Sequence, residues 1–177
     1  MRFNPTPIPG AFQIEVDSLR DERGWFARSW CRDEFVAHGL DSALVQCNIS
    51  FNEHCGTLRG MHFQASPKEE AKVVRCTQGA IFDVIVDLRR DSPAFHRWHA
   101  SELTADNHHA LYIPAGVAHG FQTLTDRSEV HYQMSETFSP AHACGVRWND
   151  PSFAIRWPDA PRRIIAEKDA SYPDVGR

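Results

Sequence analysis

The sequence predicts an all-β fold made of short strands. Apolar and polar residues alternate along Phe82–Leu88 and again along Val130–Gln133, and a period of two is the pattern of a half-buried β-strand. Glycine or proline interrupts the chain about every ten to fifteen residues, as is typical of a β-sandwich or barrel. In the first strand we expect Asp87 to face outward.

Further strands are expected around one turn and near the C-terminus. The segments LYIP and FQTL flank the turn at Pro114–Gly116, and GVRW (145–148) and FAIRWP (153–158) follow later in the chain. Short runs rich in β-branched and aromatic residues favour strands. We expect the tryptophans of the last two segments, Trp148 and Trp157, to lie in the core.

Two short helices are expected to flank the strands. Arg32–His38 is predicted as a helix because Asp33 lies near its start and Gly39 follows its end. A second, shorter helix is expected near Glu167. At 177 residues the chain is long enough for one self-sufficient core, so we expect a single domain over residues 1–177.

The composition argues against several classes of partner. A net charge of −4 does not favour nucleic acid as a bulk partner. No apolar run approaches the roughly 20 residues that a membrane helix needs, and the N-terminus lacks the pattern of a signal peptide. The five cysteines form no Cys-x-x-Cys pair, which favours free thiols in a reducing compartment. We therefore expect a cytoplasmic protein with no nucleic-acid or membrane partner.

Two segments share a distinctive spacing of glycine and histidine. The first is Gly56–Gly79, with the sequence GTLRGMHFQASPKEEAKVVRCTQG, and the second is Ile113–Leu124, IPAGVAHGFQTL. The second contains Pro-x-Gly-x-x-His at Pro114, Gly116 and His119. Together the two segments resemble the sequence mark of the cupin barrel. The resemblance implies a double-stranded β-helix, or jelly roll.

The ligands that metal-binding cupins use are replaced in this chain. In those proteins the first segment supplies His-x-His and a glutamate. Here it supplies His62 and Gln64, and Lys72 occupies the glutamate position. A lysine ammonium has three donors and no lone pair, so it cannot ligate a cation. The sequence therefore predicts a metal-free pocket whose histidines transfer protons.

Segments spread over nearly the whole chain match one family. They are Asp21–Trp30, Gln46–Ser50, Leu58–Gln64, Lys72–Arg89, Ser92–Trp98, Ile113–Phe121, Val146–Pro151 and Glu167–Ala170. On these segments the chain resembles the dTDP-4-dehydrorhamnose 3,5-epimerase family. The resemblance implies a homodimer with sites shared between subunits, no metal or cofactor, and a nucleotide-sugar substrate, dTDP-4-dehydro-6-deoxy-D-glucose. It also implies a place in L-rhamnose-type deoxysugar and polysaccharide synthesis.

The chemistry of that substrate requires three kinds of group. The C4 ketone acidifies the hydrogens on C3 and C5, so inversion needs a base, an enolate stabiliser and an acid on the opposite face. The resemblance implies His62 as the base, because a histidine titrates near neutral pH, with Asp169 orienting it. It implies Lys72 beside the developing oxyanion. Tyr132 is implied as the acid, since a phenol stays protonated at neutral pH.

The resemblance also implies substrate-binding residues. Arg59 matches the diphosphate contact. His119 is expected to contact the substrate with Asp83 as its partner, although Asp83 also fits an outward strand position. The other matching positions are Arg23, Arg28, Gln46, Asn48, Lys168, Phe26 and Phe138. In the family the segment around Arg23 reaches into the partner subunit's site, and Phe26 also fits an anchor of a dimer interface.

Three positions depart from the family's pattern. Arg28 and Ala143 stand where the family usually has glutamate, and Phe138 stands where it often has tyrosine. Losing a glutamate at a base-reading position removes an acceptor for the N–H of thymine, and arginine has only donors. One hypothesis is therefore a CDP-linked substrate. The other is that Arg28 faces solvent or a phosphate and that dTDP remains the nucleotide.

Other functions remain open at this stage. The same residues fit a single-centre 3- or 5-epimerase and a ketoisomerase that moves the carbonyl between C3 and C4. A non-enzymatic reading is a sugar-nucleotide binding barrel with core histidines, but a pure binder has no need of both His62 and Tyr132. A metal-dependent cupin oxygenase is disfavoured by Lys72 and Gln64.

Overall fold

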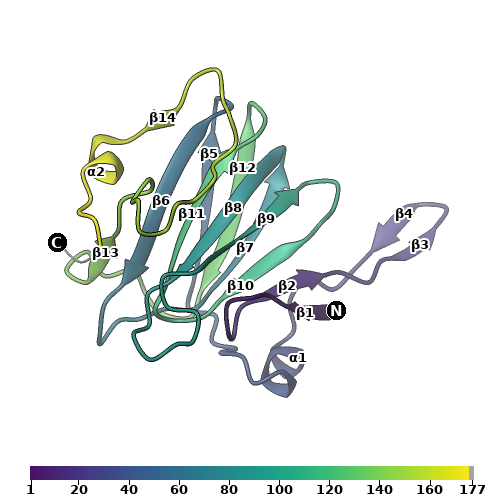
Figure 1. Cartoon of the computed structure of the whole chain (residues 1–177). Helices are drawn as coiled ribbons and strands as arrows, with labels where there is room; N and C mark the ends of the chain where they lie inside the picture. The colour runs from purple at the N-terminus through teal and green to yellow at the C-terminus, as the bar shows by residue number, and fades with distance from the viewer. Residues whose placement is uncertain (176–177) are drawn as a thin grey trace.

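Two antiparallel β-sheets form the body of the molecule (Figure 1). The structure is a computed structural model that describes residues 1–175. In spatial order, the first sheet contains β1 (Arg2–Pro5), β2 (Phe12–Glu15), β10 (Ala110–Ile113), β7 (Lys72–Gln78), β12 (Ser128–Met134) and β5 (Gln46–Asn52). The second contains β13 (Ala143–Gly145), β6 (Thr57–Gln64), β11 (Val117–Thr123), β8 (Ala80–Asp87) and β9 (Trp98–Thr104), with β14 (Ile164–Ile165) parallel to β6. The predicted all-β jelly roll is confirmed.

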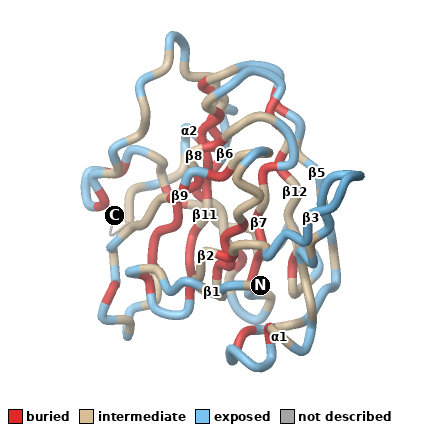
Figure 2. The backbone as a smooth tube through the Cα atoms, turned by 90° about the vertical axis from the view of Figure 1, so that its right-hand side faces the viewer, coloured by how far each residue is buried: buried red, intermediate tan, exposed pale blue. Residues whose placement is uncertain are grey.

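The main core lies between the two sheets. One cluster joins Val74 of β7 and Leu111 of β10 to Ile85 of β8 and Phe121 of β11. Burial is concentrated on these central strands in Figure 2. A second cluster, which includes Phe35 and Tyr112, packs helix α1 (Arg32–Ala37) against the first sheet. Both predicted helices are present, the second being α2 (Glu167–Ala170). Within residues 1–175, neither helix has the length and apolar character needed to cross a membrane.

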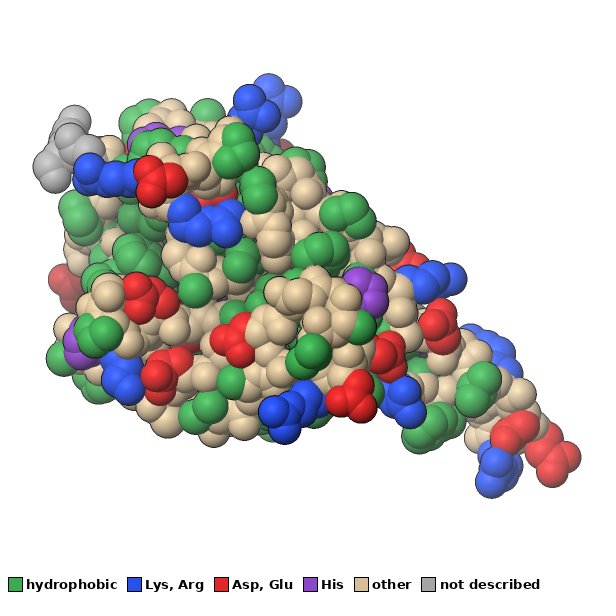
Figure 3. All heavy atoms as spheres, turned by 90° about the horizontal axis from the view of Figure 1, so that it is seen from below, with side chains coloured by type: hydrophobic (Ala, Val, Ile, Leu, Met, Phe, Trp, Pro, Cys, Tyr) green, Lys and Arg blue, Asp and Glu red, His purple; other side chains and the backbone are tan. Residues whose placement is uncertain are grey.

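A hairpin projects from this body as an arm. Strands β3 (Leu19–Asp21) and β4 (Gly24–Phe26) pair only with each other. The arm extends well away from the sheets in Figures 1 and 3, and every residue of its two strands is exposed. It carries large apolar side chains, since Leu19 and Phe26 are both 71% exposed.

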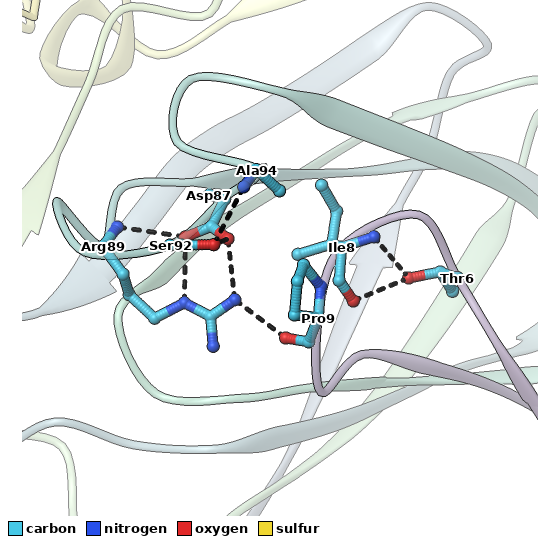
Figure 4. A network of polar contacts seen from close by, with 7 residues as sticks. All are labelled: Thr6, Ile8, Pro9, Asp87, Arg89, Ser92 and Ala94. Atoms are coloured by element: carbon cyan, nitrogen blue, oxygen red, sulfur yellow. Dashed lines mark hydrogen bonds and ion pairs between the residues drawn. The ribbon is translucent and has the colours of Figure 1, made fainter.

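The prediction that Asp87 faces outward is wrong. Asp87 is fully buried and accepts hydrogen bonds from Ser92 Oγ and from the backbone N, Nε and Nη2 of Arg89 (Figure 4). Arg89 Nη2 also donates to the carbonyl of Pro9, which ties the N-terminal loop to the end of β8. Burial alone would raise the pKa of Asp87, but its hydrogen bonds from Arg89 and Ser92 lower the pKa below its ordinary value.

Replacing Asp87 with alanine is expected to lower the free energy of unfolding by about 1.5–3 kcal/mol, the range for hydrogen bonds to a charged group. The Arg89 side chain is 30% exposed, so in the variant water replaces part of the hydrogen bonding that Arg89 loses with the carboxylate. Urea denaturation measures the loss. Asp91→Ala is the matched control, because Asp91 is exposed on the same loop and its removal should change stability by less than about 0.5 kcal/mol. Equal effects of both changes would contradict the role given to Asp87.

The C-terminal strand predictions are only partly right. Within GVRW only Gly145 belongs to a strand, β13, and residues 153–158 contain no strand. That segment instead covers one side of the second sheet, where Phe153 is buried and Trp157 packs against Phe82 of β8. The indole of Trp157 donates to the carbonyl of Trp148. Both tryptophans are half-buried. Their apolar side chains gave the sequence a strand-like pattern, although neither residue belongs to a strand.

Candidate active site

A cavity of about 580 Å³ opens between the two sheets. This volume lies in the range of small-molecule sites. It gathers nine residues that the sequence predicted for the site, namely His62, Lys72, Tyr132, Gln46, Asn48, Arg59, His119, Lys168 and Phe138. They come from β5, β7 and β12 of the first sheet, β6 and β11 of the second, and two later segments. The jelly roll therefore brings distant motifs to one cavity.

His62 is held by a carboxylate from the C-terminal segment. Its Nε2 lies 2.8 Å from Oδ1 of Asp169, and the other carboxylate oxygen accepts the backbone N–H of Gly60 at 3.1 Å. Burial would raise the pKa of Asp169, but the hydrogen bond and charge of His62 lower it, helped by Gly60 and Lys168. Asp169 therefore stays ionised at neutral pH and can stabilise a protonated imidazole.

Asp169→Asn is expected to lower turnover by about 100-fold or more, because an amide orients the imidazole without stabilising its positive charge. Turnover of the nucleotide sugar that the family resemblance implies measures the effect, with circular dichroism to verify folding. Asp159→Asn is the matched control, since Asp159 is exposed in the same C-terminal part of the chain. Activity of the Asp169 variant within about threefold of the control would remove the carboxylate from the reaction.

A second histidine–carboxylate pair lies beside the first. His119 of β11 is the direct cross-strand neighbour of His62 on β6. Its Nε2 lies 2.6 Å from Oδ1 of Asp83, which is fully buried. Burial raises the pKa of Asp83, opposed by His119 first and then by Lys72. Asp83 is thus the partner of His119, and its outward-facing reading is wrong.

Lys72 lies at the wall of the cavity, at the start of β7. Its Nζ lies 2.7 Å from Oε1 of Glu70 and donates to the carbonyl of His62 at 3.3 Å. An ammonium has three donors. One donor therefore remains for a ligand oxygen next to His62.

Tyr132 faces the cavity from the other sheet. It lies on β12, opposite Asn48 of β5, whereas His62 lies on β6 of the second sheet. Burial raises the pKa of the Tyr132 phenol, and the nearby charge of Arg59 acts in the opposite direction. The phenol is therefore protonated at neutral pH. A ligand between the sheets has a protonated phenol on one side and an imidazole on the other.

The remaining cavity residues bring cations and amides. Arg59 is anchored by Nε to Oδ1 of Asn52 at 2.8 Å. Lys168 precedes Asp169 on α2 and lines the same cavity. Gln46 accepts the backbone N–H of Phe138 at 3.0 Å. Phe138 is 52% exposed, so it lies near the cavity entrance.

The arm residues are not brought to this cavity. Arg23 forms an ion pair with Asp21 of the arm, and Phe26 is exposed at its base. Arg28 pairs with Glu34 of α1, with Nη1 and Oε1 3.0 Å apart. None of these three side chains lines the cavity of its own chain.

Several cavity residues were missed by the sequence analysis, among them Glu70, Ser50 and Tyr172. Glu70 stands two positions before Lys72 in the irregular segment that precedes β7, so no strand period marked it. Ser50 continues the inward side of β5. Tyr172 had no signal, yet its ring lies 5.9 Å from that of His62, edge to face. A Cβ on Gly145 would come within 2.4 Å of this tyrosine ring, so a side chain there would displace the ring.

Gln64 serves the fold rather than a metal. It is buried, donates to the carbonyls of Lys68 and Thr137, and accepts the backbone N–H of Ser139. Its polar atoms are thus used to hold two loops. Among residues 1–175, no group of three or more His, Cys, Asp or Glu side chains is placed to hold a metal ion.

Comparison with known proteins identifies the family. The family model described as dTDP-4-dehydrorhamnose 3,5-epimerase matches residues 5–176. The chain belongs to this family. A family member from Sinorhizobium fredii, named dTDP-4-dehydrorhamnose 3,5-epimerase, is 41% identical over 175 residues, which are 99% of this chain and 90% of the relative. Family membership confirms the predicted class of enzyme, an isomerase of the epimerase type.

Two solved structures are similar over nearly the whole chain. The first is dTDP-4-dehydrorhamnose 3,5-epimerase from Bacillus anthracis, with TDP and PPi bound. Its TM-score is 0.94 and its sequence identity is 41%, and the match covers 98% of this chain and 99% of the Bacillus anthracis chain. The second is a 3'-monoepimerase from Streptomyces bikiniensis in complex with dTDP-quinovose. Its TM-score is 0.89 and its sequence identity is 34%, and the match covers 96% of this chain and 86% of the Streptomyces bikiniensis chain. The same fold is therefore found in an enzyme named as a 3,5-epimerase and in one named as a 3'-monoepimerase.

Proposed function

We propose that this chain is a cofactor-independent epimerase that inverts C3 and C5 of dTDP-4-dehydro-6-deoxy-D-glucose. The observation that carries the proposal is that His62 and Tyr132 face one cavity from opposite sheets. Inversion at a carbon needs a base on one face and an acid on the other. A binding barrel needs neither.

In the proposed reaction His62 removes the proton from C3 or C5. The C–H electron pair forms a carbon–carbon double bond with C4, and the carbonyl electrons move onto the C4 oxygen. Lys72 donates a hydrogen bond to this oxyanion, and a fixed donor there is worth about 3 kcal/mol. Tyr132 then donates its proton to the opposite face of the carbon, and the ketone re-forms. Solvent returns a proton to Tyr132 and takes one from His62, so the enzyme is restored.

The nucleotide part is assigned to the cationic and aromatic residues of the cavity. Arg59 and Lys168 are proposed to bind the diphosphate, for which a planar guanidinium is well suited. Gln46, Asn48 and His119 are proposed to contact the sugar or its phosphate, and Phe138 to stack on the base. The relative from Bacillus anthracis, which holds TDP, supports this nucleotide.

The arm is proposed to complete the site in a homodimer. Its exposed Leu19 and Phe26, both 71% exposed, form an apolar surface of the kind that marks an interface. Arg23 and Phe26 are proposed to reach the partner subunit's cavity, since they lie outside their own, whereas Arg28 is held by Glu34 of its own chain. The five cysteines are free, which supports a cytoplasmic location.

The nucleotide is tested by parallel kinetics with dTDP- and CDP-linked 4-dehydro-6-deoxy-D-glucose. Arg28 is paired with Glu34 in this chain, which supports the reading that it does not select cytosine. A higher kcat/KM for the dTDP sugar is expected. A higher value for the CDP sugar would overturn the substrate assignment, and migration of the carbonyl to C3 would identify a ketoisomerase.

A further inference from the structure

Glu70 is a buried acid of the cavity wall that the proposed reaction does not use. Its side chain is 3% exposed, and its Oε1 lies 2.7 Å from Nζ of Lys72, which is itself only 10% exposed. The second oxygen, Oε2, is buried and has no hydrogen-bond partner among the described residues. The ion pair with Lys72 is therefore the contact through which this carboxylate acts.

This arrangement is poorly suited to stabilising the fold. Burying two charges costs desolvation energy that an ion pair repays only when the remaining lone pairs are also satisfied. Here one carboxylate oxygen is left without a partner. Such a group in a native structure calls for an explanation other than stability, and the position of Glu70 beside Lys72 in the cavity supplies one.

Glu70 and His62 together determine where the Lys72 ammonium lies. Nζ is 2.7 Å from Glu70 Oε1 and 3.3 Å from the carbonyl of His62. Lysine is a point charge on a flexible four-carbon stem, so without Glu70 it would be free to turn toward other acceptors, including a ligand diphosphate.

We propose that Glu70 is a positioning residue that acts through Lys72. It holds the charged ammonium beside His62, where its remaining donor meets the C4 oxygen as negative charge develops. This inference rests on the proposed function and deepens it, because it assigns part of the oxyanion stabilisation to a residue that never touches the substrate.

A double-mutant cycle tests the assignment. The kcat and KM for the dTDP sugar are measured for Glu70→Gln, for Lys72→Met and for the double variant. Lys72→Met is expected to lower kcat by about 100-fold or more. Glu70→Gln is expected to lower kcat by about 10-fold or more, but by no more than Lys72→Met does. KM should change by less than about threefold. In the Lys72→Met background the same change should alter kcat by less than about twofold.

Glu69→Gln is the matched control, since Glu69 is the exposed neighbour in the same segment, and it should leave kcat unchanged. Thermal denaturation verifies folding. It should show that Glu70→Gln stabilises the Lys72→Met protein, where it removes an unpaired buried charge. An equal loss of kcat in both backgrounds, or a wild-type kcat for Glu70→Gln, would overturn the assignment. A wild-type protein that turns over neither sugar nucleotide would overturn the proposed function itself, and this inference with it.

Discussion

Replacing His62 with alanine is expected to lower turnover by about 10³-fold, within the range that general-base catalysis contributes. The variant should also lose exchange of the C3 and C5 hydrogens with solvent, because His119, the other histidine that lines the cavity among residues 1–175, is held by Asp83 and not by Asp169. Proton NMR of the substrate in heavy water measures both effects.

His54→Ala is the matched control for this change. His54 is exposed in the loop before β6 and does not line the cavity, so its removal should leave turnover unchanged. If the His62 variant kept exchange at both carbons, another group would be the base, and His119, the cross-strand neighbour, would be the first to examine.

Replacing Tyr132 with phenylalanine is expected to separate proton removal from inversion. His62 still removes the proton, but without the phenol it returns a solvent-derived proton to the same face. The substrate should therefore take up deuterium with retained configuration, while inversion falls by about 100-fold or more. NMR of label uptake together with the coupling constants of the sugar ring distinguishes the two outcomes.

Tyr112→Phe controls for the loss of a phenol in the fold. Tyr112 is buried and its oxygen accepts the backbone N–H of Asp41, away from the cavity. This variant should be less stable but should keep the wild-type ratio of inversion to exchange. Normal inversion by the Tyr132 variant would remove that residue as the acid.

Most of the predicted site came from motif spacing and the family resemblance, and only Tyr132 lies on a strand that periodicity predicted. His62, Lys72 and His119 lie on β6, β7 and β11, which no periodic pattern had marked. Asp169 is different, because 107 residues separate it from His62. No local pattern reports such a contact, so it was expected only from the family resemblance.

The rest of the site could not be read from local sequence for identifiable reasons. Glu70 precedes its strand in an irregular segment, and Tyr172 is placed by the C-terminal tail, whose Pro173 carbonyl accepts the N–H of Arg147. Asp87 matched an outward strand position, but it is buried because the arginine two residues later forms a partly buried ion pair with it. The strand prediction for the FAIRWP segment was wrong because a segment whose aromatic residues pack on a sheet has the same composition as a strand.

Stereochemical analysis in heavy water tests the central claim, inversion through an enolate, most directly. The wild-type protein is incubated with dTDP-4-dehydro-6-deoxy-D-glucose, and C3 and C5 are followed by NMR. One solvent deuterium at each of the two inverted carbons is expected, since both the acid and the base exchange with water. Deuterium at one carbon only would make the protein a single-centre epimerase. Inversion without any solvent deuterium would contradict the enolate reaction proposed for His62, Lys72 and Tyr132.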